Sequence, residues 1–75
     1  MKRYRNLNGN SGVAGYESGD DFIVIRFRDG HTYEYNSERP GRRHVSKMQA
    51  LAEKGAGLAT YINQHVRDHY ARKLD

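Results

Sequence analysis

The sequence predicts an α+β fold, in which a three-stranded antiparallel sheet is followed by two helices packed on one face (order βββαα). Residues 13–36 are rich in β-branched and aromatic side chains and are broken by turn residues. Residues 42–73 instead repeat apolar side chains at the three- and four-residue spacing of helices. A Pro40-Gly41 turn separates the two halves, so the helices are expected to cover one face of the sheet.

The three strands are expected at residues 13–17, 22–28 and 31–36. The first is weakened by its glycine, and the Ser18-Gly19-Asp20 turn follows it. The second, from Phe22 to Arg28, has the strongest strand signal in the chain. Asp29-Gly30 then forms a hairpin turn that leads into the third strand.

The length of the hairpin loop decides which residues face the helices. A two-residue loop would put the apolar residues of the second strand on the same face as the polar residues of the third. A three-residue loop, with Gly30 in the left-handed conformation, pairs Ile23 with Tyr35 and Ile25 with Tyr33. Because this register gathers the apolar side chains on one face, we favour the three-residue loop with a glycine bulge.

Both helices should present an apolar stripe to the sheet. The first is expected over residues 42–54 and should end at Gly55. The second should run from about Leu58 to Lys73. The stripes are Val45, Met48, Leu51 and Ala52 in the first helix, and Leu58, Ile62 and Val66 in the second.

The chain has 75 residues, which is enough for one domain. We expect residues 1–12 to form a flexible basic N-terminal arm and residues 13–75 to form a single domain. With 36% hydrophobic residues the core is small, and formation of a homodimer would help to stabilise it. The net charge of +4 favours nucleic acid or an acidic protein as a partner.

The chain contains no cysteine, which excludes disulfides and thiolate metal sites. No apolar run is long enough to span a bilayer, so no membrane association is expected. No apolar run follows the basic N-terminus, so there is no sign of a Sec-type signal peptide. These features predict a cytoplasmic protein.

A basic hinge between the two halves is the main candidate site. Arg39, Arg42 and Arg43 lie within five residues, at the expected start of the first helix, and Lys47 follows one turn later. Unpaired N–H groups and the macrodipole make a helix N-terminus favourable for anions, and arginine adds bidentate phosphate donors. Arg67, on the second helix, could extend this basic patch.

Tyr33 and Tyr35 share one face of the third strand. Exposed tyrosines beside arginines would form a platform on which bases stack. The favoured hairpin register instead places both rings among the apolar side chains, so we expect them to pack in the structure. A tyrosine at the edge of the core could still offer its hydroxyl to a ligand.

Catalytic and metal sites have little support. The serines lie in turns or on a helix surface, with no oriented base nearby in the sequence. His65 and His69 are four residues apart, but a zinc site needs further ligands that the sequence does not indicate. We therefore expect no catalytic residues, no metal and no cofactor, and a protein that is not an enzyme.

The chain resembles the KTSC domains, small domains named for the C-terminus of some lysyl-tRNA synthetases. The resemblance runs from about Val13 to Tyr70, although the hinge is longer and more basic than is typical of the family. The matching residues are Gly15-Tyr16-Glu17, Ile23, Ile25, Phe27, Asp29-Gly30, the signature Tyr33 and Tyr35, Ala52, Lys54, Gly55, Tyr61, Asn63, Val66, Arg67 and Tyr70. The resemblance implies no established activity, and its synthetase context suggests RNA binding.

The sequence therefore predicts a small non-catalytic binding module, with RNA favoured over DNA. The candidate nucleic-acid-binding residues are Arg39, Arg42, Arg43, Lys47, Arg67, Tyr33 and Tyr35. Two alternatives stay open. One is a protein-interaction module, such as a phage or plasmid accessory protein, and the other is a binder of a small nucleotide ligand.

Overall fold

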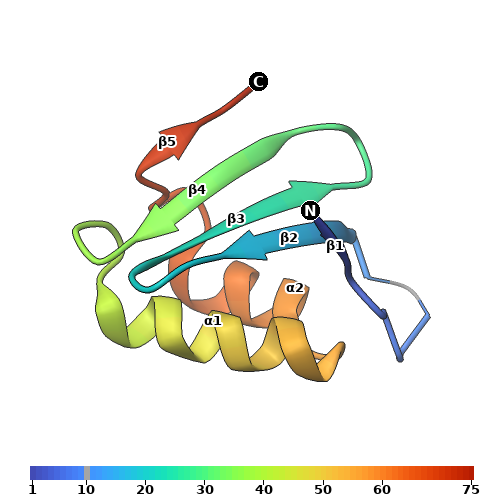
Figure 1. Ribbon diagram of the computed structural model, residues 1–75. Coiled ribbons are helices and arrows are strands. Elements are labelled where there is room, and N and C mark those ends of the chain that lie inside the picture. The colour runs from blue at the N-terminus through green and yellow to red at the C-terminus, as the bar shows by residue number, and fades with distance from the viewer. Residues whose placement is uncertain (10) are drawn as a thin grey trace.

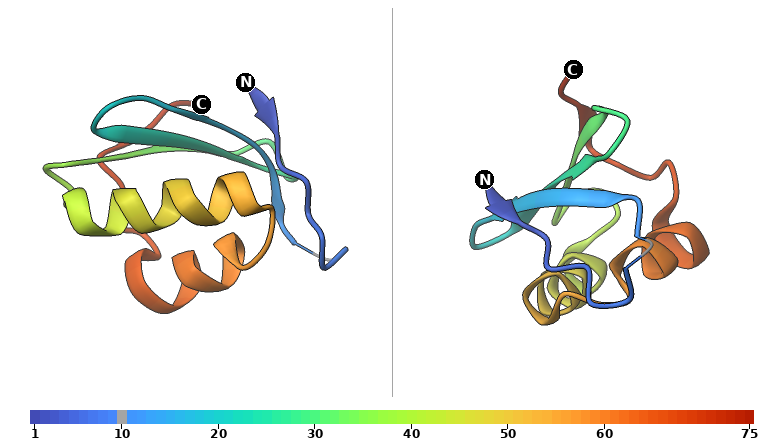
Figure 2. Two further views of the ribbon diagram at one scale, coloured as in Figure 1. Left: turned by 60° about the horizontal axis from the view of Figure 1, so that its bottom comes forward. Right: turned by 90° about the vertical axis from the view of Figure 1, so that its right-hand side faces the viewer.

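The computed structural model describes residues 1–9 and 11–75, and over these residues the sheet has five antiparallel strands in the order β1-β2-β3-β4-β5. The strands are β1 (Lys2–Arg3), β2 (Val13–Ser18), β3 (Phe22–Phe27), β4 (Thr32–Asn36) and β5 (Arg72–Lys73). The helices are α1 (Arg42–Lys54), α2 (Leu58–Tyr61) and the π-helical segment η1 (Ile62–Val66), which continues α2. The helices lie on one face of the sheet, and the opposite face is left open (Figures 1 and 2). The α+β class and the placement of the helices are as predicted, but the sheet has two short edge strands, β1 and β5, in addition to the three that were predicted.

The hairpin between β3 and β4 has the predicted register. Ile23 pairs with Tyr35, and Ile25 pairs with Tyr33. The Phe27 N–H donates to the carbonyl of His31 at 2.9 Å, and Gly30 has a φ of 94°. Because this loop keeps the apolar side chains in phase, Ile23 and Ile25 become fully buried under the helices.

The core fills the space between the sheet and the helices. From α1 it contains Val45, Met48 and Ala52, which are the buried positions of the predicted stripe. Leu51, the fourth member of that stripe, is half-buried and packs against the edge of the core. The other core residues come from the strands, from the remaining helical segments and from the residue after β1; they are Tyr4, Val13, Tyr16, Ile23, Ile25, Tyr35, Leu58, Ile62 and Val66.

Residues 1–12 were predicted to form a flexible arm, but residues near the N-terminus pair with the sheet and pack on the domain. Lys2–Arg3 forms β1 and pairs with β2, and the next residue, Tyr4, is only 4% exposed. The Tyr4 hydroxyl accepts a hydrogen bond from the Leu58 N–H at 3.2 Å, at the start of α2. The described part of this segment therefore packs on the domain, and Asn10 lies outside the described residues.

The second helix is shorter than predicted. It ends at Val66 and not near Lys73, because Arg67 adopts a φ of 37° and leaves the helix. The chain then returns to the sheet as β5, where the Ala71 N–H donates to the carbonyl of Glu34 at 2.7 Å. Pairing along the edge of β4 satisfies backbone groups that would otherwise lack a partner in the sheet.

Candidate functional site

The β4–α1 connection is held in shape by Asn36, the last residue of β4. The Asn36 side-chain oxygen accepts hydrogen bonds from the N–H groups of Glu38 and Arg39, each at 3.0 Å. The Asn36 carbonyl accepts another from the N–H of Gly41 at 3.1 Å. Gly41 has a φ of 117°, which favours glycine, and α1 begins at the next residue. Hydrogen bonds to the side chain and the backbone of Asn36 thus fix where the basic hinge emerges from the sheet.

The start of α1 carries an unusual charge distribution. Gly41 provides no side-chain cap, and the first turn contains no acidic residue. Arg42 and Arg43 instead occupy the first two helical positions. A charge at a helix end interacts with the macrodipole by about 0.3–1 kcal/mol, and unfavourably when it is positive at the N-terminus. An anion bound at this end would interact favourably with both the helix and the arginines.

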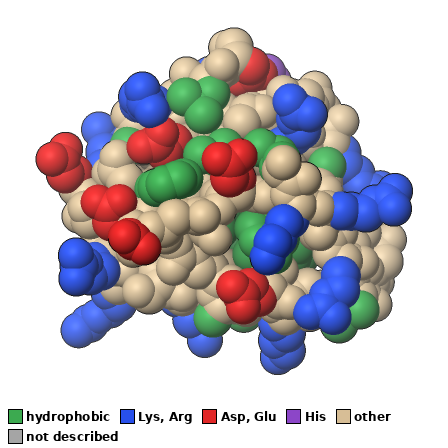
Figure 3. Space-filling view, viewed as in Figure 1, with side chains coloured by type: hydrophobic (Ala, Val, Ile, Leu, Met, Phe, Trp, Pro, Cys, Tyr) green, Lys and Arg blue, Asp and Glu red, His purple; other side chains and the backbone are tan. Residues whose placement is uncertain are grey.

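We call Arg39, Arg42, Arg43 and Lys47 the hinge cluster. All four side chains are exposed. Among residues 1–9 and 11–75, Arg72 is the one arginine or lysine that forms an ion pair with a carboxylate, so the hinge cluster is not neutralised within the described chain. The hinge cluster is not the whole positive surface, since Figure 3 shows Lys and Arg side chains around the rim of one face and several Asp and Glu side chains within it.

A group of three rings, which we call the ring cluster, lies where α1 meets α2 and η1. His44 Nδ1 and the Tyr61 hydroxyl oxygen are 2.7 Å apart. The centroids of the Tyr61 and His65 rings are 4.5 Å apart, and those of His44 and His65 are 6.2 Å apart. His44 directly follows Arg43 and precedes Lys47 by one turn, so the ring cluster adjoins the hinge cluster.

The ring cluster was not predicted from the sequence. The spacing of Tyr61 and His65 indicates that they share one side of a helix. Their approach to His44, 17 residues away from Tyr61, depends on how the helices pack. His69 lies beyond the end of η1, so His65 and His69 are not one turn apart on a common helix as predicted.

A second site is a hollow of about 280 Å³ beside β4 and the end of η1. We call it the tyrosine hollow. Its lining residues are Phe27, Tyr33, Tyr35, Ile62, Asn63, Arg67, Asp68 and Tyr70. The rings of Tyr33 and Tyr70 lie against each other with their centroids 4.6 Å apart and a 34° angle between their planes.

Tyr35 forms the buried end of the tyrosine hollow. Its side chain is 1% exposed, and its hydroxyl donates to the Arg67 carbonyl at 3.4 Å. Burial raises the pKa of Tyr35 to about 12, with smaller contributions from Tyr33 and Tyr70. This hydroxyl therefore stays protonated at neutral pH and acts as a hydrogen-bond donor.

The structure divides the seven predicted site residues between two places. Arg39, Arg42, Arg43 and Lys47 form the hinge cluster, as their spacing indicates. Tyr33, Tyr35 and Arg67 line the tyrosine hollow together. The expectation that the tyrosines pack is confirmed: Tyr35 is buried in the core, and the half-buried Tyr33 packs against the core while part of it reaches the surface.

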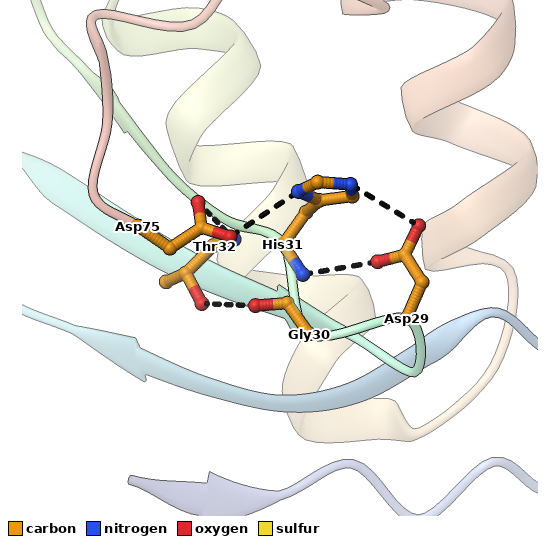
Figure 4. A network of polar contacts seen from close by, with 5 residues as sticks. All are labelled: Asp29, Gly30, His31, Thr32 and Asp75. Atoms are coloured by element: carbon orange, nitrogen blue, oxygen red, sulfur yellow. Dashed lines mark hydrogen bonds and ion pairs between the residues drawn. The ribbon is translucent and has the colours of Figure 1, made fainter.

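The hairpin end of the sheet holds a small polar network (Figure 4). Asp75 accepts a hydrogen bond from the Thr32 N–H at 3.2 Å and lies 3.2 Å from His31 Nδ1. The Thr32 N–H and His31 lower the pKa of Asp75. Asp29 lies 3.9 Å from the other ring nitrogen of His31, so the two carboxylates sit at opposite nitrogens of the ring. This arrangement attaches the C-terminal segment to the hairpin and does not gather ligands around one point.

In the part of the chain that the structure describes, no three His, Asp or Glu side chains come together in a way that could hold a metal ion. None of its helices combines the length and the apolar character needed to cross a bilayer.

Comparison with known proteins gives no family assignment. No protein-family model matches the chain, and neither the curated proteins nor the solved structures that were searched gave a match. The similarity to KTSC domains therefore stays a prediction from the sequence.

Proposed function

We propose that this protein is a non-catalytic module that binds nucleic acid, with RNA favoured over DNA. The observation that carries the proposal is the hinge cluster. It places four exposed cations at the positive end of α1, without a carboxylate partner among the described residues. A polyanion would supply the missing negative charge, and guanidinium groups can hold phosphate oxygens in a bidentate manner.

The ring cluster supports single-stranded nucleic acid over a duplex. His65 is exposed, and its ring lies against that of Tyr61. Both rings contact His44, which follows Arg43 on α1, so they lie beside the hinge cluster. Proteins that bind single strands combine a positive surface along the backbone with aromatic side chains on which bases stack. Bases in a duplex are stacked on each other and are not free to use such a surface.

The proposal is tested by titrating labelled single-stranded RNA, duplex RNA and duplex DNA at two salt concentrations, with fluorescence anisotropy as the readout. The double variant Arg42→Ala/Arg43→Ala removes two phosphate contacts. On single strands each contact contributes about 0.7 to the slope of log K against log salt, so the slope should fall by about 1.4. The affinity should also fall.

The matched control is Arg26→Ala/Arg28→Ala, which removes the same charge from two exposed positions outside the hinge cluster. Arg26 is near the C-terminal end of β3, and Arg28 directly follows that strand. This variant should bind RNA more tightly than the hinge variant does. Equal affinity of the hinge variant and the original protein at low salt would contradict the proposal. Loss of binding to all three nucleic acids at moderate salt would also contradict it and would favour a protein partner.

A further inference from the structure

The tyrosine hollow has the size of a site for one small planar group. Pockets that hold drug-sized ligands typically enclose about 300–1,000 Å³, so a hollow of about 280 Å³ is at the lower limit of that range. Such a volume suits a single ring system and is too small for a dinucleotide. The hollow is separate from the hinge cluster, none of whose residues line it.

The walls of the hollow are mainly aromatic. Phe27 meets Tyr33 edge-on with ring centroids 5.9 Å apart, and Tyr35 meets Tyr70 in the same way at 6.5 Å. Tyr33 and Tyr70 are half-buried, so part of each ring is accessible from solvent. Partly exposed aromatic rings held by their neighbours lose little conformational freedom when another flat ring packs against them.

Polar groups lie on one side of these rings. Asn63, Arg67 and Asp68 line the hollow from η1 and the residue pair that follows it, and all three are exposed. A carboxylate accepts hydrogen bonds from the exocyclic amino group of a base, an amide can both donate and accept, and a guanidinium pairs with phosphate. This combination matches the edge of a nucleobase together with its phosphate.

The backbone at Arg67 shapes this side of the hollow. A φ of 37° is uncommon for a residue other than glycine, and residues in such conformations cluster at ligand sites. Here the conformation ends η1 and turns the chain so that Asp68 and Tyr70 line the hollow. It also brings the Arg67 carbonyl to the Tyr35 hydroxyl.

We propose that the tyrosine hollow binds one nucleobase, which packs against Tyr33 and Tyr70 while Asp68 accepts a hydrogen bond from its amino group. The base comes either from single-stranded RNA or from a free nucleotide. The RNA source rests on the function proposed above, whereas the free nucleotide does not.

The test is an NMR titration of the ¹⁵N-labelled full chain with cytidine, uridine and their 5′-monophosphates. Nucleosides carry no phosphate, so they report on the hollow without the hinge cluster. Amide shifts should concentrate at residues 33–35 and 62–70. Cytidine should bind more tightly than uridine, because only cytosine presents an amino group to Asp68.

Three variants separate the site from its surroundings. Asp68→Asn keeps the shape of an exposed side chain, removes its charge and adds an N–H donor. The affinity for cytidine relative to uridine should therefore fall about fivefold, since the amide can donate to the carbonyl oxygen of uracil. Tyr70→Ala should reduce the affinity for both nucleosides. Arg42→Ala/Arg43→Ala should leave nucleoside binding unchanged, because neither arginine lines the hollow.

The outcomes distinguish this site from the function proposed for the hinge. RNA binding that depends on the hinge cluster, with no nucleoside shifts in the hollow, overturns the nucleobase site and leaves the RNA proposal standing. Nucleoside shifts in the hollow without RNA affinity support the site with a free nucleotide as its ligand and overturn the RNA proposal. Shifts that are scattered over the surface, or unchanged affinity in Tyr70→Ala and Asp68→Asn, overturn the nucleobase site.

Discussion

Arg72 donates a hydrogen bond to the Glu34 carboxylate at 2.6 Å, and this ion pair joins β5 to β4. The two residues are direct cross-strand neighbours. The Glu34 side chain is 15% exposed and the Arg72 side chain is 67% exposed, so the ion pair lies at the protein surface and is partly accessible to solvent. It links the last strand of the sheet to the strand that leads into the hinge.

The Glu34–Arg72 pair makes stability depend on pH. Hydrogen bonds from Arg72 and then Asn36 outweigh desolvation and lower the pKa of Glu34. A lowered pKa in the folded state stabilises the protein above the pKa of the unfolded chain, which is about 4.3. This contribution is lost as the pH falls through the lower folded value. The free energy of unfolding in urea should therefore contain a contribution from this pair at pH 7 that decreases toward pH 3. After allowance for solvent screening, this contribution should be about 0.2–1 kcal/mol.

Arg72→Ala provides the comparison for this pH effect. The variant should lose more stability at pH 7 than at pH 3, because the contribution of the ion pair decreases as the pH falls toward the lowered pKa of Glu34. Equal losses at the two pH values would show that Arg72 acts through packing and not through its charge.

Gly55→Ala should destabilise the protein more than Gly30→Ala. Both glycines have positive φ, at 83° and 94°, so alanine is strained at each by about 1–2 kcal/mol. At Gly30 the added Cβ has no heavy atom within 4 Å, whereas at Gly55 it would lie 2.7 Å from the Arg5 Cβ. Urea unfolding of both variants measures the difference, and an equal loss would indicate that the N-terminal segment moves aside without cost.

Tyr4→Phe should cost about 1–3 kcal/mol, because it leaves the buried Leu58 N–H without its acceptor. Tyr16→Phe is the matched control, since Tyr16 is similarly buried and its hydroxyl makes no hydrogen bond to the described protein atoms. In urea unfolding, the free energy of unfolding of the control should differ from that of the original protein by no more than about 0.5 kcal/mol. Equal stability of Tyr4→Phe and Tyr16→Phe would contradict a role for residues 1–9 in positioning α2.

His65→Ala should weaken the binding of single-stranded RNA without changing its salt dependence. Stacking of a base on an aromatic side chain contributes about 1–3 kcal/mol and, for a neutral ring, involves no release of counterions. In anisotropy titrations at several salt concentrations, the plot of log K against log salt should therefore have the same slope as for the original protein and lie at lower affinity. A reduced slope would mean that His65 contacts phosphate, and an unchanged line would exclude a contact with RNA.

The features that could be predicted from the sequence rest on neighbours along the chain. The hairpin register follows from the alternation of apolar residues around Asp29-Gly30, and the end of α1 follows from Gly55. The hinge cluster was also predictable, because its members lie within nine residues and a helix start is signalled by Pro40-Gly41. Each of these signals acts over a few residues, so no knowledge of distant contacts is needed.

Other features depend on contacts between distant segments. Nothing in the sequence around Arg67 signals a helix end, since neither glycine nor proline occurs there. After the helix ends at Val66, residues 71–74 hydrogen-bond to the open edge of β4, a pairing with a distant segment. The ring cluster and the tyrosine hollow likewise join residues that lie far apart in the sequence.

Local sequence patterns thus predict the α+β class, the order of the three central strands, the register of the hairpin between β3 and β4, the first helix and the basic hinge. Periodicity and turn chemistry are local properties, because they depend only on residues that are close together in the chain. Tertiary structure alone decided the two edge strands, the early end of the second helix and the meeting of Tyr33, Tyr35, Arg67 and Tyr70 around one hollow. The physical reason is that edge pairing and ring contacts gain free energy only after the core has brought distant segments together.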